Sequence, residues 1–344
     1  MTTLAHDPAR TTPAGRPQNA PGSGQAGPRL RGTAWLVWRQ HRAAFWTLIA
    51  LTLLGVVAMV FLRGQVVDYL DAHPRESGGL PPDFDEYTSR LFSFGGYLGY
   101  VPLLTGVLLG APLIAGDLES GTAKLVTSQS VSRLRWLTTK LAMPGALIAL
   151  STAVLAAVFD WWWSPVKERA DTPEWTSSAI FDVTWVMPVA YALLTFAVGA
   201  AVGMLLRRTL VSMVVTLGVV VAIGVVWSRF RLDLGHILSV STDKGVGPGA
   251  ARPELPAGAV QQGEGTYFLT SSGARLDWTA CLDKVDDDRA HTACLESKRV
   301  IGWSIDYLPI SQMHTMQWLG AGIMLAVTAA IVAFVVFWGR KRLL

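Results

Sequence analysis

The sequence predicts an all-α polytopic membrane protein with six transmembrane helices. Three observations support this fold class. Of the 344 residues, 51% are hydrophobic and only 16% are charged, whereas soluble domains carry about 25% charged residues. Six apolar stretches are long enough to cross the hydrocarbon core, which needs roughly 20 helical residues. No charged residue or histidine lies inside any of these stretches.

The six predicted spans divide the chain into inner and outer segments. They cover residues 43–62, 95–115, 141–159, 184–206, 209–227 and 317–338. Backbone groups in lipid must be hydrogen-bonded internally, so each span is expected to be a helix. The first five spans therefore form one transmembrane region over 43–227, and the sixth follows a long connection.

Two segments precede the first span. Residues 1–28 are rich in Pro, Gly, Ala and Thr, which predicts a disordered tail. In residues 29–42 the apolar side chains share one helical face and the arginines line the neighbouring one. The apolar face consists of Leu30, Ala34, Val37 and Trp38, and the basic face consists of Arg31, Arg39 and Arg42. The pattern predicts an amphipathic interfacial helix, and a solvated lead-in anchored by its arginines is the alternative.

The distribution of charge predicts the orientation. With the N-terminus in the cytoplasm, the inner segments hold 15 Lys and Arg against 3 acids, and the outer segments hold 14 against 22. Basic residues concentrate in cytoplasmic loops. The sequence therefore predicts a multi-pass protein of the cell membrane with both termini in the cytoplasm, ending in a basic tail over 339–344.

The long outer segment 228–316 contains both cysteines, Cys281 and Cys294. Disulfides persist in oxidising compartments, so we expect a bridge here, and two free thiols are the alternative. Together with His291 the cysteines match no zinc spacing, so no metal site is expected. A connection of about 89 residues is long enough to be an extracytoplasmic domain with its own structure.

The uncharged spans exclude several classes of function. An embedded enzyme would need a nucleophile, an acid–base pair or a metal set in the membrane, and gradient-driven carriers place ionisable groups there. We therefore expect no catalytic residue, and the energy for transport must enter from elsewhere. The chain has no G-x-x-x-x-G-K-[ST] loop for nucleotide phosphates, so no cofactor is expected on it.

Two smaller patterns concern packing and the membrane surface. Glycines four residues apart predict close helix contacts in the second and fourth spans. These pairs are Gly106 with Gly110 and Gly199 with Gly203. The run Trp161–Trp163 follows the third span and predicts an aromatic belt at the outer interface.

The inner loop between the second and third spans, residues 116–140, is short, charged and basic. Residues 122–139 contain no Pro or Gly and are expected to be helical. The basic face of such a helix could bind anionic lipid or a cytoplasmic partner. An ATP-hydrolysing partner would supply the energy that the spans cannot.

This loop carries a resemblance to a known family. An acid, a Gly-Thr pair, a Ser-Arg pair and a lysine before the next span follow one another as Glu119, Gly121, Thr122, Ser132, Arg133 and Lys140. A second match, "CLESKRVIGWSIDYLPISQMHTMQW", precedes the last span with Cys294, Tyr307, Pro309 and Gln317. The chain resembles ABC-2-type ABC transporter permeases, in an actinobacterial-like subgroup.

The resemblance implies a transmembrane permease subunit of an ATP-driven ABC exporter. Segment 116–140 would contain a coupling helix that contacts a separate ATP-binding subunit, and that subunit would hold ATP and Mg²⁺. The residues implied in coupling are Asp117, Glu119, Gly121, Thr122, Lys124, Arg133, Arg135 and Lys140. A second permease chain, identical or similar, would complete the pathway in the lipid bilayer, and no nucleic acid is implied. A membrane sensor that reads a ligand with its outer domain is the alternative function.

Overall fold

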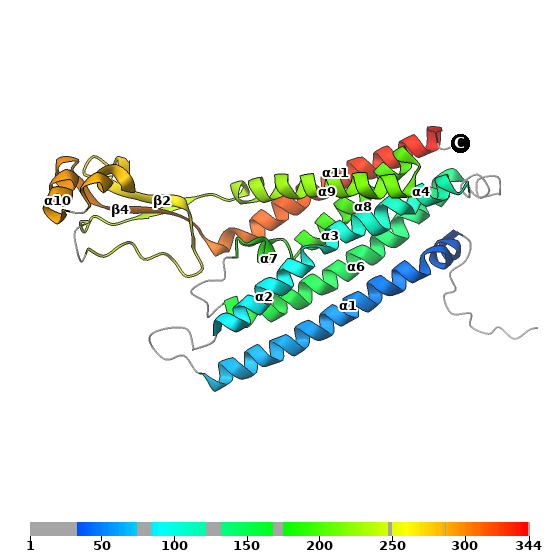
Figure 1. The fold of residues 1–344 in the computed structure, drawn as a ribbon, viewed down its shortest axis with the longest axis horizontal. Helices are drawn as coiled ribbons and strands as arrows, with labels where there is room; N and C mark the ends of the chain where they lie inside the picture. The colour runs from blue at the N-terminus through cyan, green and yellow to red at the C-terminus, as the bar shows by residue number, and fades with distance from the viewer. Residues whose placement is uncertain are drawn as a thin grey trace, which may run out of the picture.

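The computed structural model describes residues 33–73, 84–121, 132–167, 175–246, 250–285 and 287–342. The tail predicted over 1–28 lies outside these residues. A long bundle of helices carries a small β-domain at one end, and the start of α1 and the C-terminus lie at the other (Figure 1). We call these two ends the sheet end and the terminal end.

Within the described residues, six helical stretches are long and apolar enough to cross a membrane, as the sequence predicted. The helices of the bundle are α1 (Thr33–Ala72), α2 (Phe84–Leu98), α3 (Val101–Leu104), the π-helical η1 (Thr105–Gly110), α4 (Ala111–Glu119), α6 (Arg133–Lys167), α7 (Ser178–Phe181), α8 (Met187–Leu206), α9 (Thr209–Phe230), the 3₁₀ helix η2 (Arg231–Leu234) and α11 (Met313–Arg342). The second stretch is built from α2, α3, η1 and α4, and η2 extends the fifth.

Helix α1 joins the predicted interfacial segment to the first span. Its 40 residues make it about 60 Å long at 1.5 Å per residue, roughly twice the hydrocarbon thickness. The backbone at His41 is non-helical, with φ −110° and ψ 15°. The predicted boundary at residue 42 is therefore a kink, and the turns before it bend away from the axis of the longer part (Figure 1).

The second span is interrupted, whereas the sequence predicted a single helix over 95–115. Helix α2 ends at Leu98, and α3 and α4 then begin with Pro102 and Pro112 in their first turns. Proline lacks an N–H and fits there without losing a hydrogen bond. Between α3 and α4 the chain continues without a gap through the wider turns of η1.

Helix α8 is the centre of the bundle and contacts α4, η1, α6, α9 and α11. The predicted glycine pairs lie at this centre. A Cβ atom at Gly199 would lie 2.2 Å from the Gly106 carbonyl oxygen, and one at Gly110 would lie 2.5 Å from that of Phe196. The broken span and α8 therefore touch backbone to backbone, which side chains larger than hydrogen would prevent.

The tryptophans after the third span do not form the predicted aromatic belt. Helix α6 continues through them, and Trp162 and Trp163 are each 1% exposed in the main hydrophobic core. Trp162 packs edge-on against Phe94 of α2. Only Trp161 faces outward, with the Arg63 guanidinium 3.9 Å from the centroid of its ring. Successive residues of a helix point about 100° apart, so one run of three cannot share a single surface.

The long segment 228–316, which the sequence predicted to lie outside, contains a four-stranded antiparallel sheet in the order β1-β4-β2-β3. Its elements are β1 (Leu238–Ser241), β2 (Val260–Thr270), β3 (Arg275–Asp277), the 3₁₀ helix η3 (Trp278–Lys284), α10 (Asp288–Ser297), β4 (Val300–Leu308) and the 3₁₀ helix η4 (Ile310–Gln312). The all-α prediction is therefore wrong for this segment. Strand β4, "VIGWSIDYL", is rich in the β-branched and aromatic residues that favour strands.

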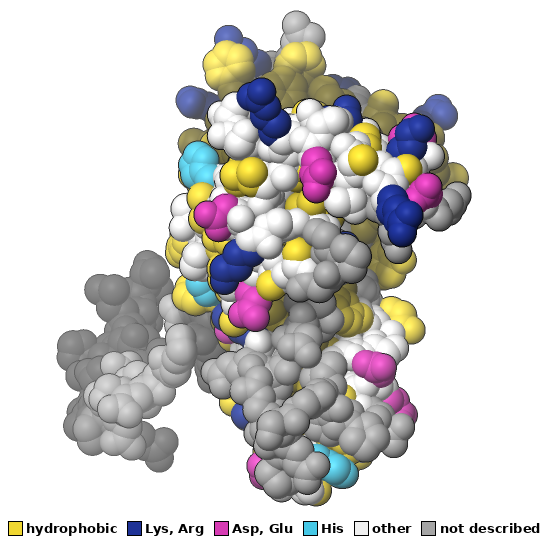
Figure 2. All heavy atoms as spheres, turned by 90° about the vertical axis from the view of Figure 1, so that its left-hand side faces the viewer, with side chains coloured by type: hydrophobic (Ala, Val, Ile, Leu, Met, Phe, Trp, Pro, Cys, Tyr) yellow, Lys and Arg dark blue, Asp and Glu magenta, His cyan; other side chains and the backbone are white. Residues whose placement is uncertain are grey.

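The predicted disulfide between Cys281 and Cys294 is present, with Cα atoms 6.1 Å apart. It joins η3 to α10, and Cys281 lies in a small core with Phe268 and Leu295. Viewed from the sheet end, the surface shows basic and acidic side chains interspersed, without a large area of one sign (Figure 2).

Two sets of hydrogen bonds hold the place where the β-domain meets the bundle. Gln312 donates to the His236 carbonyl at 2.9 Å and accepts from the His236 N–H at 2.7 Å, which ties η4 to the segment before β1. Trp175 Nε1 donates to the Gly258 carbonyl at 2.9 Å. Strand β4 continues through η4 into α11, so the sheet and the last helix share one length of chain.

Candidate functional site

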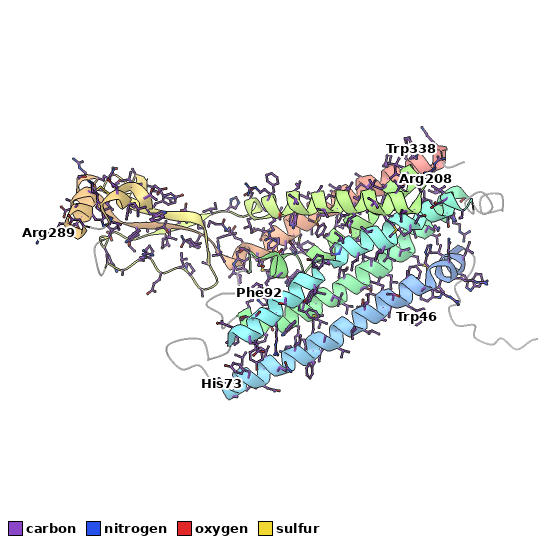
Figure 3. All side chains as sticks on the ribbon, in the orientation of Figure 1. Trp46, His73, Phe92, Arg208, Arg289 and Trp338 are labelled. Atoms are coloured by element: carbon purple, nitrogen blue, oxygen red, sulfur yellow. A yellow bond between two sulfur atoms is a disulfide. The ribbon has the colours of Figure 1, made fainter. Side chains whose placement is uncertain are left out.

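Polar side chains from four helices meet at the terminal end of the bundle. This end carries Arg208 and Trp338, and Arg289 marks the opposite end (Figure 3). Helix α4 ends here and α6 begins here, so the charged loop between them leaves the bundle at this place. We call the group formed by Gln40, Asp117, Glu119, Lys140 and Thr209 the terminal junction.

The centre of the terminal junction is a buried ion pair between Lys140 of α6 and Asp117 of α4. Their side chains are 1% and 6% exposed. Lys140 Nζ donates to Asp117 Oδ2 and, at 2.9 Å, to the Leu113 carbonyl. Gln40 Nε2 of α1 donates to Asp117 Oδ1 at 2.5 Å. Buried charges are tolerated when each is paired and further hydrogen-bonded, and both conditions hold here.

The position of Asp117 explains why it needs these partners. It lies in the last turn of α4, where exposed carbonyl groups make the helix end negative and an acid is unfavourable. Lys140 offsets this repulsion. Because Gln40 and Lys140 bind different oxygens of one carboxylate, the end of α4 is fixed to α1 and α6 together.

Glu119, two residues further, binds the start of another helix. The Thr209 N–H donates to Glu119 Oε2 at 2.8 Å. Thr209 is the first residue of α9, whose preceding residue, Arg208, makes no side-chain cap. The first N–H groups of a helix lack intrahelical partners, and a carboxylate both satisfies one and matches the positive end of the dipole. Glu119 therefore caps α9 from α4.

The chain turns immediately after these contacts. Gly121 has φ +72°, a left-handed conformation that glycine adopts without strain. On the returning side, the Arg135 N–H donates to Ser132 Oγ at 3.3 Å, so Ser132 caps the first turn of α6. The described ends of the loop are thus held on both sides.

Of the eight residues predicted for coupling, Glu119 caps α9 and Gly121 turns the chain, and the other six fall into three groups. Thr122 and Lys124 lie outside the described residues, and nothing is described of the Arg133 side chain. Arg135 is exposed on the surface. Asp117 and Lys140 are buried and bind one another, so in this conformation they hold the base of the loop and present no surface to a partner.

The predicted loop helix over 122–139 needs a correction in its second half. From Arg133 onward these residues are the first turns of α6, continuous with the third span. Sequence reasoning also missed Gln40 and Thr209. Gln40 is an isolated amide among arginines and gives no signal by itself. Thr209 follows the Arg207–Arg208 turn, so the expected start of the fifth span marked it as a helix terminus.

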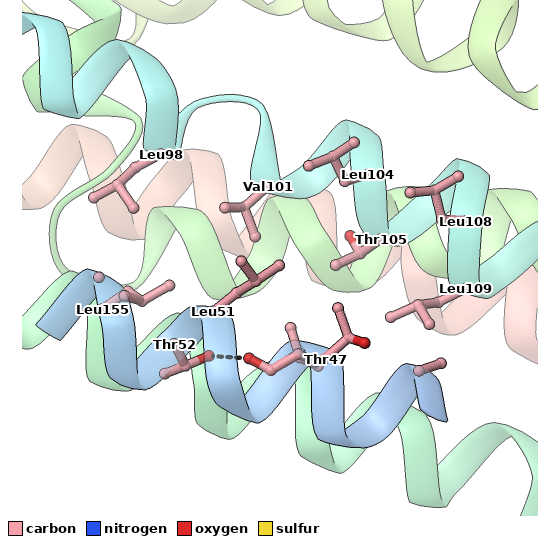
Figure 4. A pocket seen from close by; sticks show the side chains of 13 residues that line it. Thr47, Leu51, Thr52, Leu98, Val101, Leu104, Thr105, Leu108, Leu109 and Leu155 are labelled. Atoms are coloured by element: carbon pink, nitrogen blue, oxygen red, sulfur yellow. Dashed lines mark hydrogen bonds between the residues drawn. The ribbon is translucent and has the colours of Figure 1, made fainter. Parts of the chain in front are cut away.

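A second candidate is an apolar pocket of about 360 Å³ between α1 and the broken span. Leu51 comes from α1, Leu104 and Leu108 come from α3 and η1, and Leu155 comes from α6 (Figure 4). Two threonine hydroxyls in the lining are already used within their helices, since Thr52 donates to Leu48 and Thr105 to Pro102. The pocket fits an apolar group. Within the described residues, no cluster of His, Cys, Asp or Glu could hold a metal ion.

A family model described as ABC-2 membrane transporter related matches residues 49–231, more than half of the chain. The chain belongs to the ABC-2 membrane transporter related family. No curated protein matches it. The ABC-2 match and the six membrane-length helices together make the chain a multi-pass, permease-like transport component of a membrane. They favour this class over the sensor.

The ABC-2 match covers most of the terminal junction. It runs from α1 to the first residue of η2 and includes Asp117, Glu119, Lys140 and Thr209. Gln40, the β-domain and α11 lie outside it. Membership of this family implies association with an ABC ATP-binding subunit and a membrane.

Proposed function

We propose that the chain is the permease subunit of an ATP-driven exporter of the ABC-2 type. Segment 116–140 contacts a separate ATP-binding subunit in the cytoplasm. The observation that carries the proposal is that the last turn of α4, at the start of this segment, is bonded to α1, α6 and α9. A movement of the loop would therefore be transmitted directly to α1, α6 and α9.

The charges at the terminal end support the cytoplasmic orientation. Exposed cations surround this end, and Glu119 is the one exposed acid at the same end in the described part of the chain. The cations are Arg39, Arg42, Arg135, Arg207, Arg208, Arg340 and Lys341. Basic residues next to spans face the cytoplasm. Both termini and the loop are then cytoplasmic, and the β-domain with its disulfide lies in the oxidising outer compartment.

The mechanism follows from what the loop is attached to. ATP and Mg²⁺ bind the partner, and closure of two partner subunits displaces the loops of two permease chains. Asp117 passes the displacement to α1 and α6, and Glu119 passes it to the start of α9. A partner can drive this change only if its contact with the loop differs between the ATP-bound and ATP-free states.

Coupling is tested by charge reversal with a matched control. The chain is co-expressed with the ABC ATP-binding subunit encoded nearest to its gene. We expect Lys124→Glu/Arg133→Glu/Arg135→Glu to reduce the co-purified subunit to background. The control, Lys284→Glu/Arg289→Glu/Lys298→Glu, reverses three exposed cations at the sheet end and should retain it. Equal co-purification by both triple variants and the unaltered chain would reject the coupling assignment.

Orientation is tested separately by adding one cysteine at a time to the chain, in which Cys281 and Cys294 are joined in the disulfide. Ser120→Cys lies at the base of the loop and Ala274→Cys lies on the exposed turn before β3. A membrane-impermeant maleimide added to intact cells should label the chain with Ala274→Cys only. Labelling of Ser120→Cys from outside would place the loop in the wrong compartment for an ATP-binding partner.

A further inference from the structure

The start of α1 carries two exposed tryptophan–arginine pairs, one on each side of the kink at His41. Trp35 and Arg39 precede the kink, and Arg42 and Trp46 follow it, and the members of each pair are four positions apart in the sequence. Residues four apart share a helical face. Trp35 is 47% and Trp46 is 61% exposed, although tryptophan is usually well covered.

The two arginines carry positive charge that nothing within the described residues neutralises. Arg39 lies over the Trp35 ring at 5.2 Å from its centroid. Neither Arg39 nor Arg42 forms an ion pair in the described part of the chain. Helix α1 contains no acid before Asp68. By contrast, Arg63 at the other end of α1 donates to the Trp161 carbonyl.

The depth of this surface identifies what lies against it. Trp46 stands at the beginning of the apolar run that continues to residue 62, and Trp35 lies on the other side of the kink, about 9 Å of helix before His41 at 1.5 Å per residue. Tryptophan collects at the level of lipid headgroups, where one side of the ring is apolar and the other is wet. Trp38 touches the Trp46 ring across the kink, at 6.2 Å between centroids, so the two halves form one surface.

We propose that Trp35, Arg39, Arg42 and Trp46 bind the phosphate of an anionic phospholipid at the terminal end of the bundle. The guanidinium groups supply charge-assisted hydrogen bonds to phosphate, and the two rings bracket the headgroup in the interface. A membrane lipid fits better than an acidic protein partner because the surface is flanked by exposed indoles at interfacial depth and is continuous with a span.

The lipid would act on the terminal junction through one residue. Gln40 lies between Arg39 and the kink, and its amide holds Asp117 Oδ1. A headgroup that fixes the turns before the kink therefore fixes the position of Gln40. The proposal is independent of ATP coupling, since it needs only a membrane-spanning α1.

The binding test compares phosphatidylglycerol with phosphatidylcholine of equal chain length. Native mass spectrometry measures how much of each lipid stays bound to the purified full chain. We expect selective retention of phosphatidylglycerol. Arg39→Gln/Arg42→Gln should weaken it about fivefold per arginine, the effect of roughly one interfacial cation. The control Arg340→Gln/Lys341→Gln removes the same charge at the same end and should bind as the unaltered chain does.

Two further variants make the outcome decisive. Arg39→Lys/Arg42→Lys should keep most of the binding, which shows that the glutamine variant is not simply misfolded, and equal melting temperatures check this directly. Equal losses in the arginine variant and the control would mean diffuse attraction and would overturn the site. Displacement of the lipid by millimolar inorganic phosphate, or unchanged lipid binding with loss of a protein partner in Arg39→Glu/Arg42→Glu, would also overturn it.

Discussion

Lys140 and Asp117, 23 residues apart in the chain, form an ion pair inside the protein at the point where the charged loop leaves the bundle. Both side chains are almost fully covered. The pair holds α4 against α6, and Gln40 extends the contact to α1. Two of the charges that the sequence suggested for a docking surface are thus internal, and they fix the base of the loop.

Removing one partner of this pair should destabilise the protein strongly. Lys140→Met leaves the Asp117 carboxylate buried without a cation, and we expect the free energy of unfolding to fall by about 3–5 kcal/mol. The measurement is denaturant-induced unfolding of the purified chain in nanodiscs. Lys341→Met, an exposed lysine at the same end, should change it by no more than about 0.5 kcal/mol.

A double variant tests whether the lost stability comes from the unpaired charge. Asp117→Leu/Lys140→Met removes both charges, and apolar replacement of a buried pair is often neutral. It should recover most of the lost stability while still lacking the acceptor for Gln40. If the single and double variants lose the same stability, the two residues do not depend on one another.

Glu119 should control the order of the first turn of α9. Glu119→Ala removes the acceptor of the Thr209 N–H, so hydrogen exchange at Thr209 and the next amides should accelerate, while exchange in the middle of α9 stays slow. Glu119→Gln keeps an oxygen acceptor and should show a smaller effect. Unchanged exchange in both variants would mean that the cap at 2.8 Å does not protect the helix start.

The spans were predictable because a bilayer imposes a length and an apolar composition on each one. The disulfide was predictable because compartment restricts cysteine chemistry. The contacts of Gln40 and Thr209 in the terminal junction could not be predicted. Each residue acts through a partner more than 70 residues away, and neither residue type is unusual in its place. The break in the second span followed from Pro102 and Pro112, whose effect on helix geometry depends on the packing against α8.

The β-domain shows a different limit. Cross-strand partners such as Phe268 and Trp303 lie on strands far apart in the sequence, and a disulfide-bearing loop gives no register. Strand β4 alternates only in part, because both of its faces are partly covered. The sequence indicated a folded segment here without its topology.

Substitution of the glycines between the broken span and α8 should depend on what surrounds each one. The new methyl group in Gly199→Ala meets the Gly106 carbonyl oxygen at 2.2 Å, so the helices must separate at a cost of about 1–3 kcal/mol. Gly218→Ala on α9 meets nothing within 4 Å and gains up to about 1 kcal/mol of helix propensity. Thermal unfolding should therefore shift in opposite directions, and equal shifts would contradict the close contact.

Loss of the disulfide should loosen the β-domain and leave the bundle intact. Cys281→Ala/Cys294→Ala removes a constraint worth roughly 3 kcal/mol in the chain-entropy model, and the core around Cys281 is small. Limited proteolysis of the full chain should cut the double variant faster between residues 242 and 300. Unchanged cleavage there would show that the sheet alone maintains the domain.

The start of η3 should weaken at acid pH, because Asp277 caps it. The Thr279 hydroxyl and N–H donate to Asp277 Oδ1 at 2.6 and 2.8 Å, and the hydroxyl bond is the main reason that the pKa of this carboxyl lies below its ordinary value. The fold thus favours the carboxylate. The stabilisation is complete above the unfolded pKa of about 3.9 and is lost as the pH falls through the lower, folded pKa.

Asp277→Asn should therefore be less stable than the unaltered chain at pH 7, and the difference should shrink below about pH 4 as the unaltered chain loses the charge. A difference in melting temperature that stays constant over this range would show that the charge of Asp277 contributes nothing.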